Sequence, residues 1–232
     1  TAATAVLVGR SNGGLAAARN TGLLYARGRF VAFLDSEDLF DGATYRRMHA
    51  LGEAHAADLV FAHAVCMDPI DQSPSGFPDR SVWNAIMQGA AMRRTTLARE
   101  PRLLSLEASA ATRLYSVKRS RPAMARAERI CLLDETGLHR RIRRDGQTPA
   151  PRDAVGIEAL ASAAMAIDEA LAAKLGGHAG ACVAGSVAQL LFWCAGLVTH
   201  DERPAYFAAA VQTMRGAPAE WAHAYGLHHA TG

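Results

Sequence analysis

The sequence predicts an α/β protein in which a parallel or mixed sheet is flanked by helices and followed by a helical C-terminal region. The first observation is that residues 4–65 alternate between short apolar runs and segments of helical periodicity, an order typical of a sheet with crossover helices. The second is that residues 153–232 are rich in alanine and carry apolar residues at helical spacing. We therefore divide the chain into a sheet domain, residues 1–150, and a helical region, residues 151–232.

The elements of the sheet domain follow from local patterns. Short apolar runs predict buried strands, and the turn at Ser11–Gly14 and the stop at Gly28 set the limits of the first helix. Residues 66–80 contain three prolines and predict a loop. In chain order the predicted elements are strand 4–8, helix 14–27, strand 29–34, helix 43–55, strand 57–65, a helix over SVWNAIMQGAAM, a strand near 112–117 and strand 127–136.

The helical region is predicted to contain three or four helices, with breaks at Gly176-Gly177, 200–204 and 216–218. Its longest apolar stretch, GACVAGSVAQLLFWCAGLV, includes Ser and Gln in a helical rhythm. This pattern favours a buried helix over a membrane span.

Composition limits the class of protein. Half of the 232 residues are apolar and a fifth are charged, which predicts a packed core and argues against disorder. The net charge of +3 gives no reason to expect a nucleic-acid partner. The four cysteines are far apart and form no CxxC pair, so we expect reduced, buried thiols in a cytoplasmic protein.

A cluster of acids follows directly on the predicted strand 29–34. Asp35, Glu37 and Asp38 lie within four residues, with Ser36 between them. Like charges this close repel one another, so a capped helix, a basic partner or a bound divalent cation must offset the repulsion. In parallel sheets ligands bind at the carboxyl ends of strands, which is where this cluster is predicted to lie.

The surrounding segment, NGGLAAARNTGLLYARGRFVAFLDSEDLF, resembles the signature of inverting family-two glycosyltransferases, which have the GT-A fold. The resemblance spans two predicted elements with fixed spacing. The matching residues are Asn12, Gly14, Ala18, Arg19, Asn20, Gly22, Ala26, Gly28, Leu34, Asp35, Ser36 and Asp38.

The resemblance implies a divalent cation, Mg²⁺ or Mn²⁺, that bridges the acidic motif and the diphosphate of a nucleotide sugar. The candidate metal ligands are Asp35, Glu37 and Asp38, and Glu37 stands where the family usually has Asp. Oxygen ligands suit both cations. The alternative for these acids is capping of the next helix.

Further candidates for binding the nucleotide sugar lie on either side of the acidic motif. By resemblance, Arg19 contacts the diphosphate, and Asn12 and Gly14 shape the turn before its helix. The basic segment 138–150, with Arg141 and Arg144, resembles a late segment that folds over the diphosphate. A solvated basic loop, or one touching an anionic membrane surface, is an equal alternative.

The resemblance also implies two absences. Family members have further strands before the signature, so we expect a partial GT-A domain that lacks its N-terminal strands. The acidic pair that usually supplies the catalytic base has no counterpart after Arg113-Leu114-Tyr115. The catalytic base is therefore unassigned, and Asp134 and Glu135 are the candidates that end strand 127–136.

The predicted function is transfer of a sugar, of hexosyltransferase type, from a nucleotide-diphosphate sugar to a hydroxyl acceptor with inversion and metal assistance. The acceptor would be a glycan or polyol polymer: a polysaccharide, a lipid-linked sugar or a wall polymer. The expected location is cytoplasmic, or at the inner face of the membrane. The alternative is a degenerate, non-catalytic interaction module of the same family.

Overall fold

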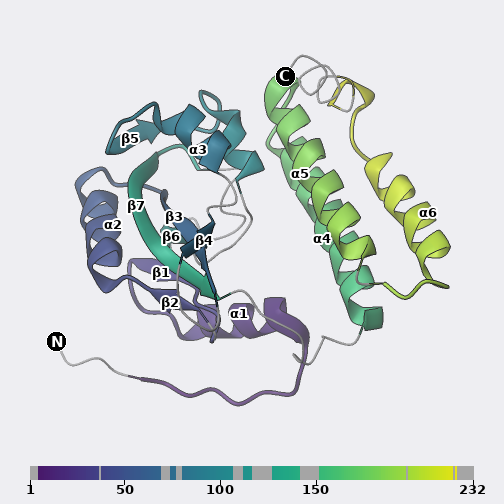
Figure 1. Cartoon of the computed structure of the whole chain (residues 1–232), viewed down its shortest axis with the longest axis horizontal. Helices are drawn as coiled ribbons and strands as arrows, with labels where there is room; N and C mark the ends of the chain where they lie inside the picture. Colours follow the sequence, from purple (N-terminus) through teal and green to yellow (C-terminus); the bar gives the residue numbers. More distant parts are fainter. Residues whose placement is uncertain are drawn as a thin grey trace.

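The computed structural model describes residues 5–36, 38–68, 74–76, 80–106, 112–116, 127–141, 152–196, 198–221 and 223. Figure 1 shows a curved sheet flanked by helices, with a group of three long helices beside it. The fold class predicted from the sequence is therefore confirmed.

The seven strands form one mixed sheet. Its main order is β1-β6-β3-β7-β2, with β4 added to β3 and β5 added to β7. Among the described strands β3 and β7 pair in parallel, and the other described pairs are antiparallel. The strands are β1 (Phe30–Ala32), β2 (Leu39–Phe40), β3 (Leu59–Met67), β4 (Pro74–Gly76), β5 (Met92–Thr95), β6 (Arg113–Ser116) and β7 (Ile130–Arg141).

Four predicted strands are confirmed as β1, β3, β6 and β7. The prediction of strand 4–8 is wrong over its described residues 5–8, which run extended without a ladder partner among the described strands. Val6 is 65% exposed and Leu7 is fully exposed, so no apolar burial holds this segment to the sheet. The predicted loop 66–80 contains the short strand β4.

The described helices match the predicted positions closely, and the 3-10 helix η1 was not predicted. They are α1 (Gly14–Tyr25), α2 (Gly42–Ala54), α3 (Arg80–Met87), η1 (Pro101–Ser105), α4 (Arg152–Ala172), α5 (Gly177–Ala195) and α6 (Arg203–Met214). No helix of the described residues combines the length and the apolar character that a membrane span requires.

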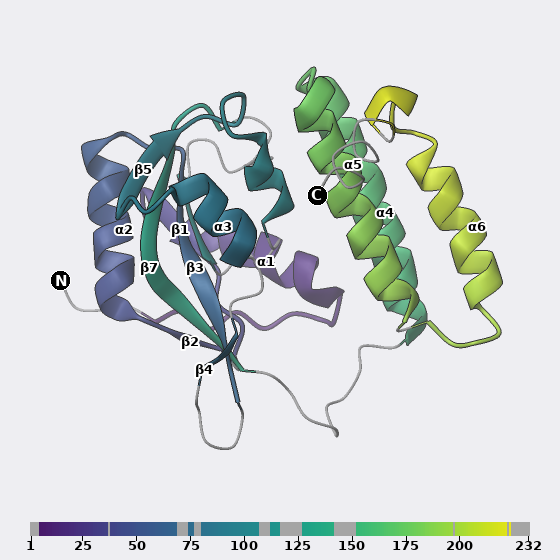
Figure 2. The ribbon, with the colours of Figure 1, turned by 45° about the horizontal axis from the view of Figure 1, so that its top comes forward.

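The two faces of the sheet carry separate parts of the core. Alternate residues of β3 point to opposite faces: Leu59 and Phe61 pack with α3 and η1, whereas Val60 and Ala62 pack beneath α2. Figure 2 shows α2 and α3 on opposite sides of β3 and β7. This alternation fixes which face each later side chain of β3 reaches.

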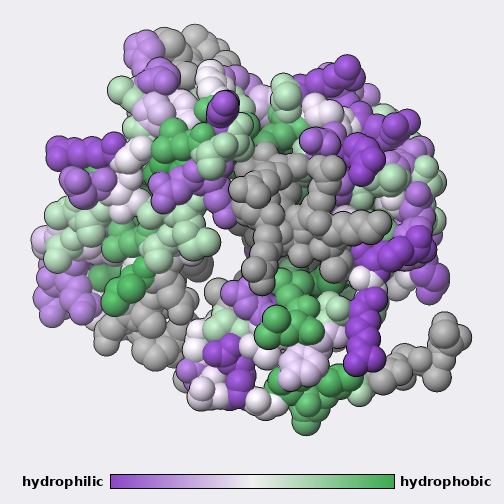
Figure 3. Space-filling model, turned by 180° about the vertical axis from the view of Figure 1, so that it is seen from behind, coloured by the Kyte–Doolittle hydropathy of each residue, from purple (hydrophilic) through white to green (hydrophobic). Residues whose placement is uncertain are grey.

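The helices α4, α5 and α6 enclose a core of their own, built largely from alanines and medium-sized apolar side chains. The helix η1 joins this core to the sheet. Leu104 packs against both cores, and the Ser186 hydroxyl donates a hydrogen bond to the carbonyl of Leu104 at 2.5 Å. The helical group also exposes apolar side chains, Phe192 and Ile157 among them, and hydrophobic areas lie over this part in the view from behind (Figure 3).

Candidate functional site

The acidic cluster forms a tight turn between β1 and β2. The amide of Asp38 donates to the carbonyl of Asp35 at 3.1 Å, which closes the turn. Asp35 is partly exposed and Asp38 is buried. Glu37, the third candidate of the cluster, lies outside the described residues.

A basic partner meets Asp35. The guanidinium of Arg19, from α1, donates to Asp35 Oδ1 at 3.0 Å. The same guanidinium lies 5.6 Å from the centre of the Phe33 ring, a distance at which a cation and an aromatic face attract. The structure thus brings together Arg19 and Asp35, two residues that the sequence assigned to one site.

Asp38 is held against the C-terminal end of β7, the longest of the described strands. Its Oδ1 accepts the backbone amide of Arg141, the last residue of β7, at 3.2 Å. The alternative that the acids cap the next helix is wrong for Asp35 and Asp38. The N-cap of α2 is Asp41, whose side chain accepts the amide of Thr44 at 2.6 Å. That hydrogen bond lowers the pKa of Asp41.

Asn12 and Gly14 shape the turn that starts α1. The Gly14 amide donates to Asn12 Oδ1 at 3.1 Å, and Gly14 has a φ of +78°, which favours glycine. These contacts place the helix that carries Arg19. Arg144 lies outside the described residues.

A groove of about 560 Å³ runs between α1 and β1. One wall is the helix from Ala18 to Ala26, and the other is the chain from Phe30 to Asp35. Arg19 and Asp35 are the charged residues that line it. The groove therefore contains one cation and one anion in contact, in otherwise apolar surroundings.

The described acids alone do not build a metal site: among the described residues no three His, Cys, Asp or Glu side chains are arranged to hold a metal ion. Asp35 nevertheless suits Mg²⁺ or Mn²⁺ bound together with a ligand. Mg²⁺ commonly takes only one or two protein carboxylates and completes its shell with phosphate oxygens and water. The carboxylate of Asp35 faces the groove and can provide such a ligand.

The strand β7 is irregular where it carries its two acids. Its register with β3 shifts between Ala62 and His63 and again after His63, so that Leu133 and Thr136 pair with consecutive residues of β3. Such a bulge re-aims side chains and is common beside functional sites. Successive residues of a strand point to opposite faces, so Asp134 lies on the face of Ile130 and Leu132 and Glu135 on the face of Cys131 and Leu133.

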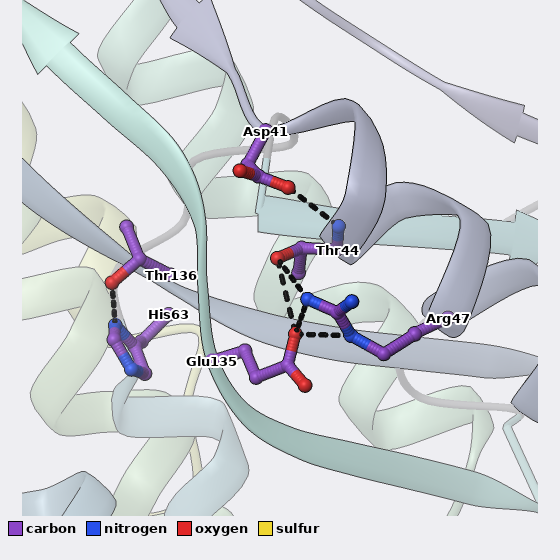
Figure 4. A network of polar contacts seen from close by, with 6 residues as sticks. All are labelled: Asp41, Thr44, Arg47, His63, Glu135 and Thr136. Carbon is purple, nitrogen blue, oxygen red and sulfur yellow. Dashed lines mark hydrogen bonds and ion pairs between the residues drawn. The ribbon is translucent and has the colours of Figure 1, made fainter.

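Glu135 turns to α2 (Figure 4). Its Oε2 accepts hydrogen bonds from Thr44 Oγ1 at 3.1 Å and from Arg47 Nε at 2.6 Å. The carboxylate raises the pKa of Arg47 by this hydrogen bond. Glu135 is thereby committed to holding α2 against the sheet.

Asp134 turns to the other face. Its Oδ1 accepts the indole N–H of Trp83 at 2.7 Å and lies 3.9 Å from Nε2 of His63. His63 in turn contacts Thr136 Oγ1 at 3.4 Å and packs edge-to-face on Trp83, with ring centres 5.6 Å apart. Burial is the main reason why the pKa of His63 is lowered, against the opposing effect of Asp134.

Sequence reasoning missed His63 and Trp83 as neighbours of Asp134. A signal existed for His63, because the alternation of β3 places it on the same buried face as Leu59 and Phe61. A titratable ring on a buried strand face needs polar partners. Nothing in the sequence indicated that Trp83 would donate to an acid on β7.

The register of the sheet places both groups of residues at one end. Ala32 of β1 and Val60 of β3 face each other across Leu114 of β6. Asp35 comes three residues after Ala32 and His63 three residues after Val60, and one strand, β6, separates β1 from β3. Asp35 and His63 therefore both lie beyond this line in the same direction along the sheet.

Comparisons with known proteins agree with the signature segment. Residues 4–95 match the family model described as Glycosyl transferase family 2. The chain is 37% identical over 54 residues to the uncharacterized glycosyltransferase EpsJ of Bacillus subtilis (strain 168), a match covering 23% of this chain and 16% of that protein.

The fold is similar to that of a solved structure, the crystal structure of S. aureus TarS 1–349 in complex with UDP-GlcNAc. The TM-score is 0.63 at 17% identity, covering 89% of this chain and 62% of that chain. This chain thus spans less than two thirds of either relative.

Proposed function

We propose that the chain binds a nucleotide-diphosphate sugar and transfers its sugar, because residues 4–95 match glycosyl transferase family 2 and the fold is GT-A-like. The observation that carries the proposal is the contact of Arg19 with Asp35 in the groove between α1 and β1. The family match supports the class of reaction, and this pair supports the place that we assign to the diphosphate.

Arg19 and Asp35 suit a complex of a divalent cation with a diphosphate. The diphosphate can bind the positive guanidinium, and the cation can bind the negative carboxylate. With no ligand bound, Arg19 and Asp35 neutralise one another. A diphosphate offers oxygens that match the planar guanidinium of Arg19, and the accompanying Mg²⁺ or Mn²⁺ would be held by Asp35. The bound cation would supply Lewis-acid stabilisation of the leaving diphosphate.

The remaining candidates support this assignment in different ways. Asn12 and Gly14 position α1, Asp38 fixes the acidic turn against β7, and Glu37 and Asp38 remain candidate metal ligands. We assign Arg141, the last residue of β7, and Arg144, which follows it in the sequence, to the binding of the diphosphate. TarS, which shares the fold, has been crystallised with UDP-GlcNAc, and that complex supports a nucleotide-sugar donor for this chain.

Inverting transfer requires a base that takes the proton from the acceptor hydroxyl. Of the two candidates on β7, we assign this role to Asp134. Its side chain is 41% exposed and is held by a neutral donor, the indole of Trp83, whereas Glu135 is occupied by Arg47 and Thr44. We infer that the acceptor is a glycan or polyol polymer and that contact with a membrane, if made, is peripheral.

The donor site is tested by calorimetric titration of the chain with UDP, GDP and CDP, with and without Mn²⁺. We expect one nucleotide to bind, and only when the metal is present. A folded chain that binds none of the three would reject the donor site and favour a non-catalytic module of the same family.

The base is tested separately with the matched variants Asp134→Asn and Glu135→Gln, each of which removes one charge without changing shape. We expect Asp134→Asn to lose turnover by roughly 10²-fold or more while it still binds nucleotide. Glu135→Gln should keep turnover and lose stability. If Asp134→Asn turns over as fast as Glu135→Gln and the parent, Asp134 is not the base.

A further inference from the structure

A second polar pocket lies at the end of the sheet away from the acidic turn. Its volume is about 240 Å³. It is built where β5 ends beside the start of β7, with Thr95 paired to Ile130, and His55 at the end of α2 completes its wall. The start and the end of β7 thus carry different sites, since Arg141 and Asp38 meet at the far end.

Positive charge converges on this pocket from separate segments of the chain. Arg94 and Arg99 come from β5 and the turn after it, and Arg129 precedes β7. The acid among the lining residues is Glu128. Glu128 lines the pocket and Asp58 pairs with Arg129, so the three guanidiniums leave an excess of one positive charge.

Arg129 is fixed in place by a buried acid. Its guanidinium donates to Asp58 Oδ1 at 3.2 Å, and Asp58 Oδ2 accepts the amides of Glu128 and Arg129 at 3.1 and 3.0 Å. Asp58 is 5% exposed. In the described part of the chain Arg94 and Arg99 make no ion pair, so their charge is available to a ligand.

Neutral donors stand beside these arginines. The hydroxyl of Thr96 accepts the amide of Arg99 at 3.2 Å, and this contact leaves the hydroxyl proton for another acceptor. Arg94 is exposed and lines the pocket together with Cys131. Burial raises the pKa of the Cys131 thiol there, and the charge of Arg94 acts in the opposite direction.

We propose that this pocket binds a phosphate group. Planar guanidiniums from Arg94 and Arg99, a tethered Arg129 and the hydroxyl of Thr96 form the donor set that a phosphate with its several acceptor oxygens requires. The phosphate comes either from a small soluble anion or from the headgroup of an anionic phospholipid. The site is separate from the Arg19–Asp35 pair and does not depend on the proposed transfer reaction.

The test begins with calorimetric titration of inorganic phosphate into the whole chain, in chloride buffer without divalent metal. We expect binding that weakens as salt is added, and that the double variant Arg94→Gln/Arg99→Gln weakens roughly tenfold or more. One single variant serves as the control and should bind as the parent does: Arg215→Gln removes an exposed charge after α6.

The second arm compares flotation of the chain with vesicles of phosphatidylglycerol and of phosphatidylcholine. Binding to phosphatidylglycerol that the double variant loses identifies a lipid headgroup as the source, whereas phosphate binding without flotation identifies a soluble anion. Both results support the site. The site is rejected if neither probe binds, or if the double variant binds as the parent does while its thermal midpoint shows it to be folded.

Discussion

Replacing Asp35 by Asn removes the charge that the donor site depends on and keeps the shape of the side chain. The ion pair with Arg19 spans 3.0 Å, but the two side chains are 27% and 34% exposed, so water screens it. Such pairs contribute about 0.2–1 kcal/mol to the free energy of unfolding. Since about 1 kcal/mol shifts the melting midpoint of a chain of this size by about 2–4 °C, Asp35→Asn should melt within about 4 °C of the parent.

The effect on nucleotide binding should be much larger than the effect on stability. A charged contact to a bound ligand is worth about 1.5–3 kcal/mol, so the metal-dependent affinity should fall roughly ten- to a hundredfold. The assay is the calorimetric titration with Mn²⁺, run beside a thermal melt. Glu220→Gln, which removes an exposed charge in the helical region, is the control and should match the parent in both.

Two results would refute the reasoning. If Asp35→Asn binds nucleotide and Mn²⁺ as tightly as the parent, then Asp35 does not hold the cation. If its melting midpoint falls by far more than about 4 °C, then the acid has a structural role and any loss of binding follows from unfolding.

Three further predictions concern stability. Met48, which is completely buried beneath α2, should cost about 2–5 kcal/mol of unfolding free energy when changed to Ala, and a loss below about 1 kcal/mol in urea unfolding would contradict tight packing there. Gly180→Ala should destabilise the protein by about 1–3 kcal/mol, because the added Cβ would collide with the Trp221 indole. Gly22→Ala meets no atom within 4 Å and should be neutral or stabilising by up to ~1 kcal/mol. If urea unfolding shows Gly22→Ala to be the less stable of the two, the contact with Trp221 is rejected. Burial lowers the pKa of His63, so its share of stability is complete above about pH 6.5 and is lost as pH falls below that value, where the unfolded chain takes up a proton first. A His63→Gln variant should therefore show a shallower fall in unfolding free energy between about pH 7.5 and 5.5, and an unchanged slope would exclude this effect.

The sequence predicted the elements better than their neighbours in space. The run RFVAFL and the alternation in residues 57–65 mark β1 and β3 without further information. The two strands follow each other in the sequence but are not neighbours in the sheet, because β6, from much later in the sequence, lies between them. Which strand takes that place is decided by long-range packing, which leaves no local pattern.

The candidate site shows the same limit. Spacing alone predicted that Arg19 and Asp35 share a site, and they lie in contact. Alternation along the strand puts Asp134 and Glu135 on opposite faces, but the contact of Glu135 with α2 could not be predicted, because it depends on long-range packing that leaves no local pattern. The Trp83 contact, from a helix far away in sequence, was out of reach for the same reason.

The alternation of side chains along β7 has an evolutionary consequence. Two neighbouring acids point to opposite faces of one sheet. A mutation of Asp134 changes the contacts with Trp83 and His63, whereas a mutation of Glu135 changes the contacts with α2. Residues in regular strands two apart share a face, and changes at one constrain the other. Asp134 and Glu135 are adjacent in the sequence but act on different faces. Asp134 can therefore change in evolution while Glu135 still holds α2 in place.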